Sequence, residues 1–503
     1  MKKQFFTLVM LVVGMTLSYA QNQALIDFHP VGDYDLEVRN LMPMRDGSVL
    51  VNSQLFNKTV DYTEMAATDV GNVFFKISTN AEIMDTLFIE DPDMNHFLLV
   101  PNPIGEDYVY ARAVRNLDEG HTDLCIKFFD NQLKFNDEKE LWVPLSDKLY
   151  KPLGDCYCLD EAGDMIIALS FNNEEVGLFR VALDGTVKAS SIVTGLPFNI
   201  TNGRHLSVYN YGDSQHCLWG FKRNTNSDGT RDFVFAFLDE QLQLIEEKIV
   251  SVPQGCGFGY NDDLMIWGGN TIVNANRYAL SNGKQGPALV VYDKSSLAPV
   301  NSRYFTECPE AYDGPAHIAY PTGVAQATDG NLFFAYFNYF PDAESALANG
   351  PAGQACVMKL DANLNILWQR FFLEPVGYYP EVRAITPLSN NGVAVAGYTV
   401  NSEGNVGLMF YVVNGSTGNT DVNDDRVRPY AFYPNPVGDC LGIQFSPDVT
   451  PTLVELYDAQ GRLVMRQKTS LESVNTTGLK AGLYTVKVTL DNGKTYSDTV
   501  IKK

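Results

Sequence analysis

Seven copies of one strand-and-turn pattern recur along residues 24–415, and this period limits the possible fold more than any other feature of the sequence. In each copy a short apolar run ends at a small polar residue, and the steps between successive polar residues are 52, 54, 55, 54, 68 and 53. The seven residues are Ser78, Asp130, Asp184, Asp239, Asp293, Asp361 and Asn414. A period in the low fifties is typical of β-propellers and related repeat arrays.

Each copy also shows the alternation of a β-strand. The residues one, three and five positions before the polar residue are apolar in every copy except at Lys127, which predicts strands with one buried face. Turn residues and further strand-like runs lie on both sides, so each copy predicts four antiparallel strands, the unit of a propeller blade. We therefore predict an all-β chain whose body, residues 21–417, is a seven-bladed β-propeller.

The stretch at residues 360–368 resembles the blades of quinoprotein-like and WD-like propellers, although the copies identify no particular propeller family. Among the other copies only one keeps the tryptophan, at Trp142. We therefore expect no bound quinone and no other cofactor.

The seventh copy lacks its last strand. The chain after Asn414 is polar, whereas an unassigned apolar run at residues 24–28 precedes the first copy. Pairing of that run with the seventh blade would close the ring and cover an open sheet edge. We predict that the N-terminal strand completes the last blade.

The N-terminus has the features of a secretory signal peptide. Two lysines precede an apolar run at residues 5–15, and Ser18 and Ala20 supply the small side chains that a signal peptidase reads. We predict a signal peptide at residues 1–20, cleaved after Ala20. The apolar run is shorter than the roughly 20 residues of a membrane-spanning helix, and we expect no transmembrane segment in the mature chain.

Residues 429–503 contain strand-like runs separated by glycine and aspartate turns, which predicts a small β-sandwich. Three short motifs and a pair of terminal lysines follow in order: Pro434, Asn435, Pro436, then Gly461, Arg462, then Gly482, Leu483, Tyr484, and finally Lys502, Lys503. This order resembles the type A C-terminal sorting domain of the type IX secretion system of Bacteroidetes.

The resemblance implies export to the cell surface or the medium after passage through the inner membrane. In this family the outer-membrane export machinery recognises the sorting domain, which is usually removed as the cargo is attached or released. An acidic linker, residues 418–428, is expected to separate it from the propeller. A calcium loop at residues 421–425 stays open, because the pattern lacks the glycine and the distal glutamate of an EF-hand.

Composition limits the partners further. With 60 acidic against 37 basic side chains the net charge is -23, so a nucleic-acid backbone would be repelled. Two of the eight cysteines, Cys125 and Cys356, occupy an inward repeat position and are expected in the core. The disulfide pairing of Cys217, Cys256 and Cys308 is left open, and we expect no metal or catalytic role for the cysteines.

Four basic residues are candidates for a ligand site: Arg39, His96, Arg204 and Arg383. Each lies eight or nine residues before a blade's turn glycine, so the first strands would bring them to one mouth of the ring. A basic ring would suit an anionic ligand. The alternative is that each arginine pairs with an acid such as Glu37 or Glu381 and supports contacts between blades.

Tyr378 and Tyr379 are a second candidate, either as an aromatic contact for a glycan or peptide or as packing residues. We find no nucleophile elbow, zinc-binding His-Glu-x-x-His or phosphate-binding loop, and predict no catalytic residues. Two functions stay open. We favour a non-enzymatic protein that recognises a protein or glycan; the alternative is a hydrolase or lyase with its site in the axial channel.

Overall fold

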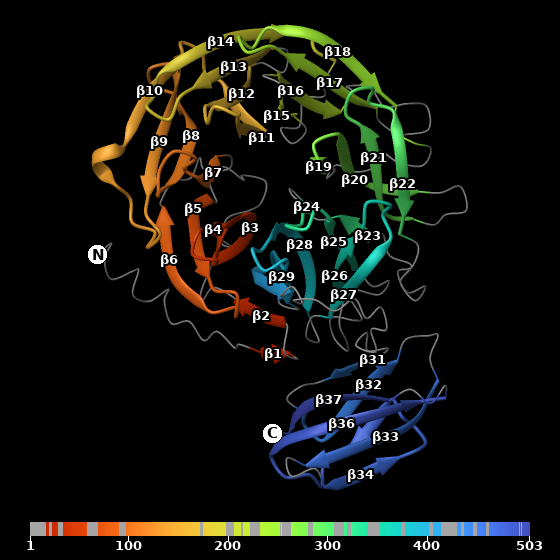
Figure 1. The fold of residues 1–503 in the computed structure, drawn as a ribbon. Coiled ribbons are helices and arrows are strands. Elements are labelled where there is room, and N and C mark those ends of the chain that lie inside the picture. The colour runs from red at the N-terminus through yellow and green to blue at the C-terminus, as the bar shows by residue number, and fades with distance from the viewer. Residues whose placement is uncertain are drawn as a thin grey trace.

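Antiparallel sheets repeat around a ring in the computed structural model of the chain, and each sheet has one edge toward the centre and the other toward the outside (Figure 1). The structure describes residues 17–19, 23–28, 34–57, 69–89, 97–171, 175–197, 206–212, 215–221, 232–251, 253, 263–279, 285–305, 316–318, 323–339, 353–373, 378–401, 406–413, 430–433, 437–445, 450–458, 462–491, 493 and 495–502. Within these residues the body contains seven sheets, which confirms the predicted fold.

The first four blades have four strands each. Blade 1 contains β3 (Tyr34–Pro43), β4 (Val49–Asn57), β5 (Asp69–Ile77) and β6 (Ile83–Ile89). Blade 2 contains β7 (Leu98–Pro101), β8 (Tyr108–Asn116), β9 (His121–Phe129) and β10 (Leu141–Ser146), with the 3-10 turn η2 (Asp137–Lys139) before β10. Blade 3 contains β11 (Lys151–Leu159), β12 (Met165–Phe171), β13 (Glu175–Val181) and β14 (Val187–Thr194). Blade 4 contains β15 (Leu206–Gly212), β16 (Gln215–Phe221), β17 (Phe233–Leu238) and β18 (Leu244–Val250).

The last three blades complete the ring. Blade 5 contains β19 (Asp263–Trp267), β20 (Thr271–Ala279), β21 (Gln285–Asp293) and β22 (Pro299–Tyr304). Blade 6 contains β25 (Leu332–Tyr339), β26 (Gly353–Leu360) and β27 (Ile366–Leu373), and two short strands, β23 (Ala316–Ile318) and β24 (Val324–Gln326), both pair with β25. Blade 7 contains β28 (Tyr378–Pro387), β29 (Val393–Asn401) and β30 (Val406–Val413).

The predicted alternation explains how the blades pack. In six copies the three alternating residues of the third strand contact the apolar cluster shared with the preceding blade, as Leu238, Ala236 and Val234 do between blades 3 and 4. In blade 2 the same face carries the exception Lys127, which forms an ion pair with Glu140 at 3.0 Å. Each seam between neighbouring blades therefore has its own core.

The repeated polar residue begins the turn between the third and fourth strands. The Asp239 carboxylate accepts hydrogen bonds from the backbone nitrogens of Gln241 and Gln243, at 2.9 and 2.8 Å. Leu242, which lies between these two glutamines, has a φ of 59° and is fully buried. Burying a leucine contributes about 1.5–3 kcal/mol, which offsets the roughly 1–2 kcal/mol cost of the left-handed conformation. Asp130 and Asp361 make the same turn.

The third copy departs from the prediction. Strand β13 ends at Val181 rather than Leu183, because the backbone turns at Ala182, whose nitrogen donates to the Thr186 carbonyl at 2.9 Å. Gly185 takes the positive φ there. The turn therefore begins two residues before Asp184, although Leu183 still packs into the core between blades 2 and 3.

The predicted ring closure is confirmed. Strand β2 (Gln23–Phe28) pairs antiparallel with β30, from Gln23 opposite Val413 to Phe28 opposite Leu408. A further strand, β1 (Leu17–Tyr19), pairs with β2 and lies inside the predicted signal peptide. Cleavage after Ala20, which stays a prediction, would leave a four-stranded blade 7 with β2 at its outer edge.

The C-terminal region contains two sheets. One has β31 (Tyr430–Tyr433), β32 (Cys440–Phe445) and β35 (Ser473–Asn475); the other has β34 (Leu463–Gln467), β33 (Pro451–Asp458), β36 (Gly482–Leu490) and β37 (Thr495–Lys502). Alternate residues of β33 and β36, such as Val454, Leu456, Val486 and Val488, are buried in one shared core. In the part of the chain that the structure describes, no helix has the length and apolar character needed to cross a membrane.

Candidate functional site

The innermost strands of blades 7 and 1 carry the same tripeptide, Glu-Val-Arg, at residues 381–383 and 37–39. Both strands have a β-bulge at the arginine: the register shifts between Val382 and Ala384 in β28 and between Val38 and Asn40 in β3. A bulge leaves one residue outside the regular pairing and re-aims its side chain. Arg39 and Arg383 are these extra residues.

The bulges bring the two arginines onto a shared partner. Glu37 lies 3.2 Å from Arg39 through one carboxylate oxygen and 3.1 Å from Arg383 through the other. Glu381 lies 2.8 Å from Arg383. We call Arg39, Glu37, Arg383 and Glu381 the arginine–glutamate cluster. It joins the innermost strand of the first blade to the innermost strand of the last.

Each arginine is also held by the residue opposite the glutamate of its own tripeptide. Gln54, opposite Glu37, accepts hydrogen bonds from Nε and Nη2 of Arg39, the first at 2.8 Å. Tyr398, opposite Glu381, accepts from Arg383 Nη2 at 2.8 Å, and the guanidinium lies 4.9 Å from its ring centroid. The two bulges are therefore built in the same way.

Gly397 makes the second bulge possible. It lies opposite Val382, and a Cβ atom at this position would be 2.0 Å from the Glu381 carbonyl oxygen. Glycine allows that close backbone approach because it has no side chain.

The cluster is electrically balanced and partly open to solvent. The side chains of Arg39, Glu37, Arg383 and Glu381 are 28%, 23%, 15% and 17% exposed. Burial alone would lower the pKa of Arg383, but the hydrogen bond to Tyr398 and the attraction to Glu381 and Glu37 raise it. Burial raises the pKa of Tyr398, whose hydroxyl therefore stays protonated. Two cations and two carboxylates together present donors and acceptors without a net positive charge.

The other predicted ligand residues are not placed. His96 and Arg204 lie outside the described residues, so the predicted basic ring stays a prediction. Arg39 and Arg383 pair with Glu37 and Glu381, as the alternative interpretation expects. Tyr378 and Tyr379 lie in β28 opposite Asn401 and Val400, but their side chains are outside the description. The sequence pattern missed Gln54, Tyr398 and Gly397. The repeated Glu-Val-Arg tripeptide is a sequence signal that could have identified this junction.

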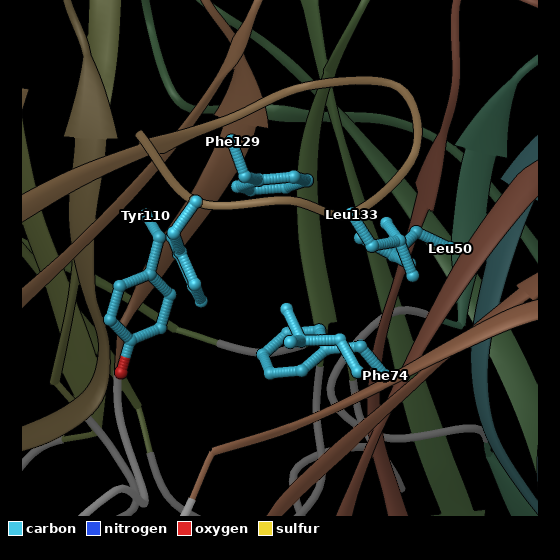
Figure 2. Close-up of a pocket in the computed structure, with 7 residues that line it drawn as sticks. Leu50, Phe74, Tyr110, Phe129 and Leu133 are labelled. Atoms are coloured by element: carbon cyan, nitrogen blue, oxygen red, sulfur yellow. The ribbon is translucent and has the colours of Figure 1, made fainter. Parts of the chain in front are cut away.

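A hollow of different character lies in the seam between blades 1 and 2 (Figure 2). Its lining is apolar: Leu50, Phe74, Leu87, Tyr110, Phe129, Leu133 and Phe135. The Tyr110 ring borders the hollow, and burial raises the pKa of its hydroxyl well above the usual value. The Tyr108 and Phe129 rings stack beside it at 5.2 Å. These contacts belong to the core between the blades.

The core expectation made for two of the cysteines is confirmed. Cys125 and Cys356 are fully buried. The described cysteines, Cys125, Cys156, Cys158, Cys217, Cys356 and Cys440, form no disulfide with one another. Cys256, Cys308, the acidic linker and its residues 421–425 lie outside the described residues. No group of three His, Cys, Asp or Glu side chains suited to a metal occurs in the described part of the chain.

In the C-terminal region the described motif residues occupy turns and strands. Arg462 directly precedes β34 and donates through Nε to Asp458, the last residue of β33, at 2.7 Å. Gly482 opens β36 with a φ of 154° and pairs with Lys502. The buried Tyr484 donates its hydroxyl to the Lys480 carbonyl at 2.8 Å. Leu483 lies in the same strand. The remaining motif residues, Pro434, Asn435, Pro436, Gly461 and Lys503, are outside the described residues.

Several solved structures are similar to the chain in fold. A protein of unknown function from Dyadobacter fermentans is 10% identical, with a TM-score of 0.40, and the match covers 79% of this chain and 99% of that one. The β-propeller domain of the Trilobed protease from Pyrococcus furiosus, which has an open velcro topology, is 11% identical, with a TM-score of 0.40 and coverage of 76% and 100%. No curated protein matches the chain.

The C-terminal region matches a family model. Residues 431–503 match the model described as the secretion system C-terminal sorting domain, in agreement with the ordered motifs. These residues are a type IX secretion sorting domain, and the chain is a cargo with a propeller body that the system exports to the cell surface or the medium.

Proposed function

We propose that the propeller is a non-enzymatic recognition protein that binds a glycan at the arginine–glutamate cluster. The observation that carries the proposal is the pair of β-bulges, which gather four charged, partly exposed side chains at the junction of blades 7 and 1. Bulges are found preferentially next to functional sites, where they re-aim side chains.

The chemistry of the cluster favours a glycan. A sugar hydroxyl both donates and accepts hydrogen bonds, and the cluster offers guanidinium donors beside carboxylate acceptors. The mutual ion pairs leave little uncompensated positive charge for an anion. The contacts from Gln54 and Tyr398 hold both guanidinium groups before a ligand arrives, which reduces the entropy cost of binding.

A glycan array with the mature chain, residues 21–503, tests the proposal. The change Glu37→Gln keeps the shape of the bridging side chain but removes its charge, and should weaken binding of any captured glycan about tenfold, since charge-assisted hydrogen bonds contribute roughly 1.5–3 kcal/mol. Lys188→Ala is the control, because it removes an ion pair with Asp164 on blade 3.

Equal binding by wild type and Glu37→Gln would exclude the cluster as the site. Capture of proteins but no glycan would indicate protein recognition instead. Shortened or unsaturated sugar products in the same wells would favour the hydrolase or lyase that the sequence leaves open.

A further inference from the structure

Trp142 is an exposed tryptophan on the outer circumference of blade 2. It lies in β10, opposite the fully buried Cys125, and 52% of its surface is exposed. The other three tryptophans are less exposed: Trp219 and Trp267 are buried, and the partly buried Trp368 contacts Phe333 and Arg370. A large aromatic surface left open on an exported protein is a candidate contact surface.

The indole is held in one orientation. Its Nε1 donates to Glu140 Oε1 at 2.8 Å, and Glu140 forms an ion pair with Lys127 at 3.0 Å. Lys127 in turn lies 5.7 Å from the ring centroid of Phe135. The hydrogen bond from Lys127 lowers the pKa of Glu140 despite an opposing effect of burial, so the carboxylate is ionised near neutral pH. The aromatic face is therefore fixed beside one cation and one anion.

The same place carries the one exception to the repeat pattern. The residues three positions before the polar turn residues are apolar in six blades, and Lys127 replaces them in blade 2. An apolar side chain at this position would serve only the packing between blades. Lys127 and its partner Glu140 instead each have 31% of the side chain exposed to solvent. Both keep hydrogen-bonding capacity toward solvent, because an ammonium has three donors and a carboxylate accepts several bonds.

We propose that Trp142, Glu140 and Lys127 form a second binding site, separate from the arginine–glutamate cluster, that takes one ring of a neutral glycan. The apolar C–H face of the sugar would stack on the indole, and its hydroxyls would bond to the carboxylate and the ammonium. The ion pair has no net charge, and the chain as a whole carries -23, so an acidic sugar is disfavoured. Two sites on one cargo raise the avidity for a polymer that reaches both.

Tryptophan fluorescence isolates this site. Mature chain is titrated with mannopentaose, cellopentaose and chitopentaose, and emission is compared with that of Trp142→Ala. We expect a saturable emission change with at least one of these sugars in the wild type and no such change in Trp142→Ala. Calorimetric titration, which needs no reporter tryptophan, should show that Trp142→Ala binds that sugar about two- to tenfold more weakly, since an aromatic contact is worth roughly 0.5–1.5 kcal/mol beyond its buried area.

Ile249→Ala is the matched control. Ile249 lies at the same blade position in β18, opposite Val234, and is 53% exposed; its removal should leave the titration unchanged. Glu140→Gln, which keeps the side-chain shape, should weaken binding severalfold. Equal affinity of wild type and Trp142→Ala, or no response to any of the three sugars, would overturn the proposal. If Glu37→Gln loses glycan binding on the array but keeps the Trp142 fluorescence response, the two sites bind independently.

Discussion

Leu242 offers a direct test of how the blade turns are built. Its side chain is fully buried in the core between blades 3 and 4, and its backbone has a φ of 59°. Truncating a buried leucine to alanine costs about 2–5 kcal/mol, because apolar burial is lost and a cavity remains. Leu242→Ala should therefore lower the free energy of unfolding by about that amount.

The glycine variant separates burial from backbone strain. In an ordinary strand position glycine is roughly 0.5–1 kcal/mol less stable than alanine. At Leu242 the order should be reversed, because alanine keeps the left-handed strain of roughly 1–2 kcal/mol that glycine relieves. We expect Leu242→Gly to be more stable than Leu242→Ala by about 1 kcal/mol.

Urea unfolding followed by circular dichroism measures both differences. Leu218 is the control, since it is fully buried in the same cluster but lies in the regularly paired part of strand β16, opposite Ala236. Its alanine variant should be more stable than its glycine variant. If the two glycine variants both fall below their alanine counterparts, the account of a strained turn supported by leucine burial is refuted.

Three further changes test the inner bulge and the buried titratable groups. Gly397→Ala places a Cβ against the Glu381 carbonyl and should destabilise the chain by about 1–3 kcal/mol in thermal unfolding; an unchanged midpoint would show that the bulge relaxes freely. Burial alone would raise the pKa of Asp329, but the hydrogen bond from Lys359 and its other partners lower it to about 2. The stability that this provides is present above pH 4 and lost toward pH 2, so Lys359→Met should flatten the acid-induced fall in the melting temperature. Burial lowers the pKa of His216 below its usual value of 6.5, so the unfolded chain binds the proton more readily and the folded chain loses stability as the pH falls below that value. The melting temperature of His216→Gln should therefore vary less between pH 7 and 5 than that of the wild type. An unaltered pH profile would contradict this.

The blades were predictable because their signal is local and repeated. Period-two alternation ending at a turn-forming aspartate, as at Asp239, depends on neighbouring residues alone, and seven repetitions outweigh single exceptions such as Lys127. The closing strand β2 was predictable because the repeat showed what was missing: the seventh copy lacked one strand, and one apolar run near the N-terminus had no partner. The shorter third strand of blade 3 was missed because Gly185 moves its turn upstream of Asp184.

The candidate site was only partly predictable. The two Glu-Val-Arg tripeptides are visible in the sequence, but a β-bulge shows no local pattern, because it depends on what the neighbouring strand allows. At Arg383 that condition is Gly397, fourteen residues away in the chain. The pairing of Arg39 with Arg383 through Glu37 depends on the closure of the whole ring, which brings the first and last blades together.

Cell fractionation tests the central claim, that residues 431–503 export the propeller. The full-length chain and a variant that lacks these residues are produced in a bacterium with a type IX system, and both are followed with an antibody against the propeller. Full-length chain should reach the cell surface or the medium, while the shortened chain should stay inside the outer membrane with an unchanged propeller melting temperature. Equal amounts of both chains outside the cell would contradict the claim.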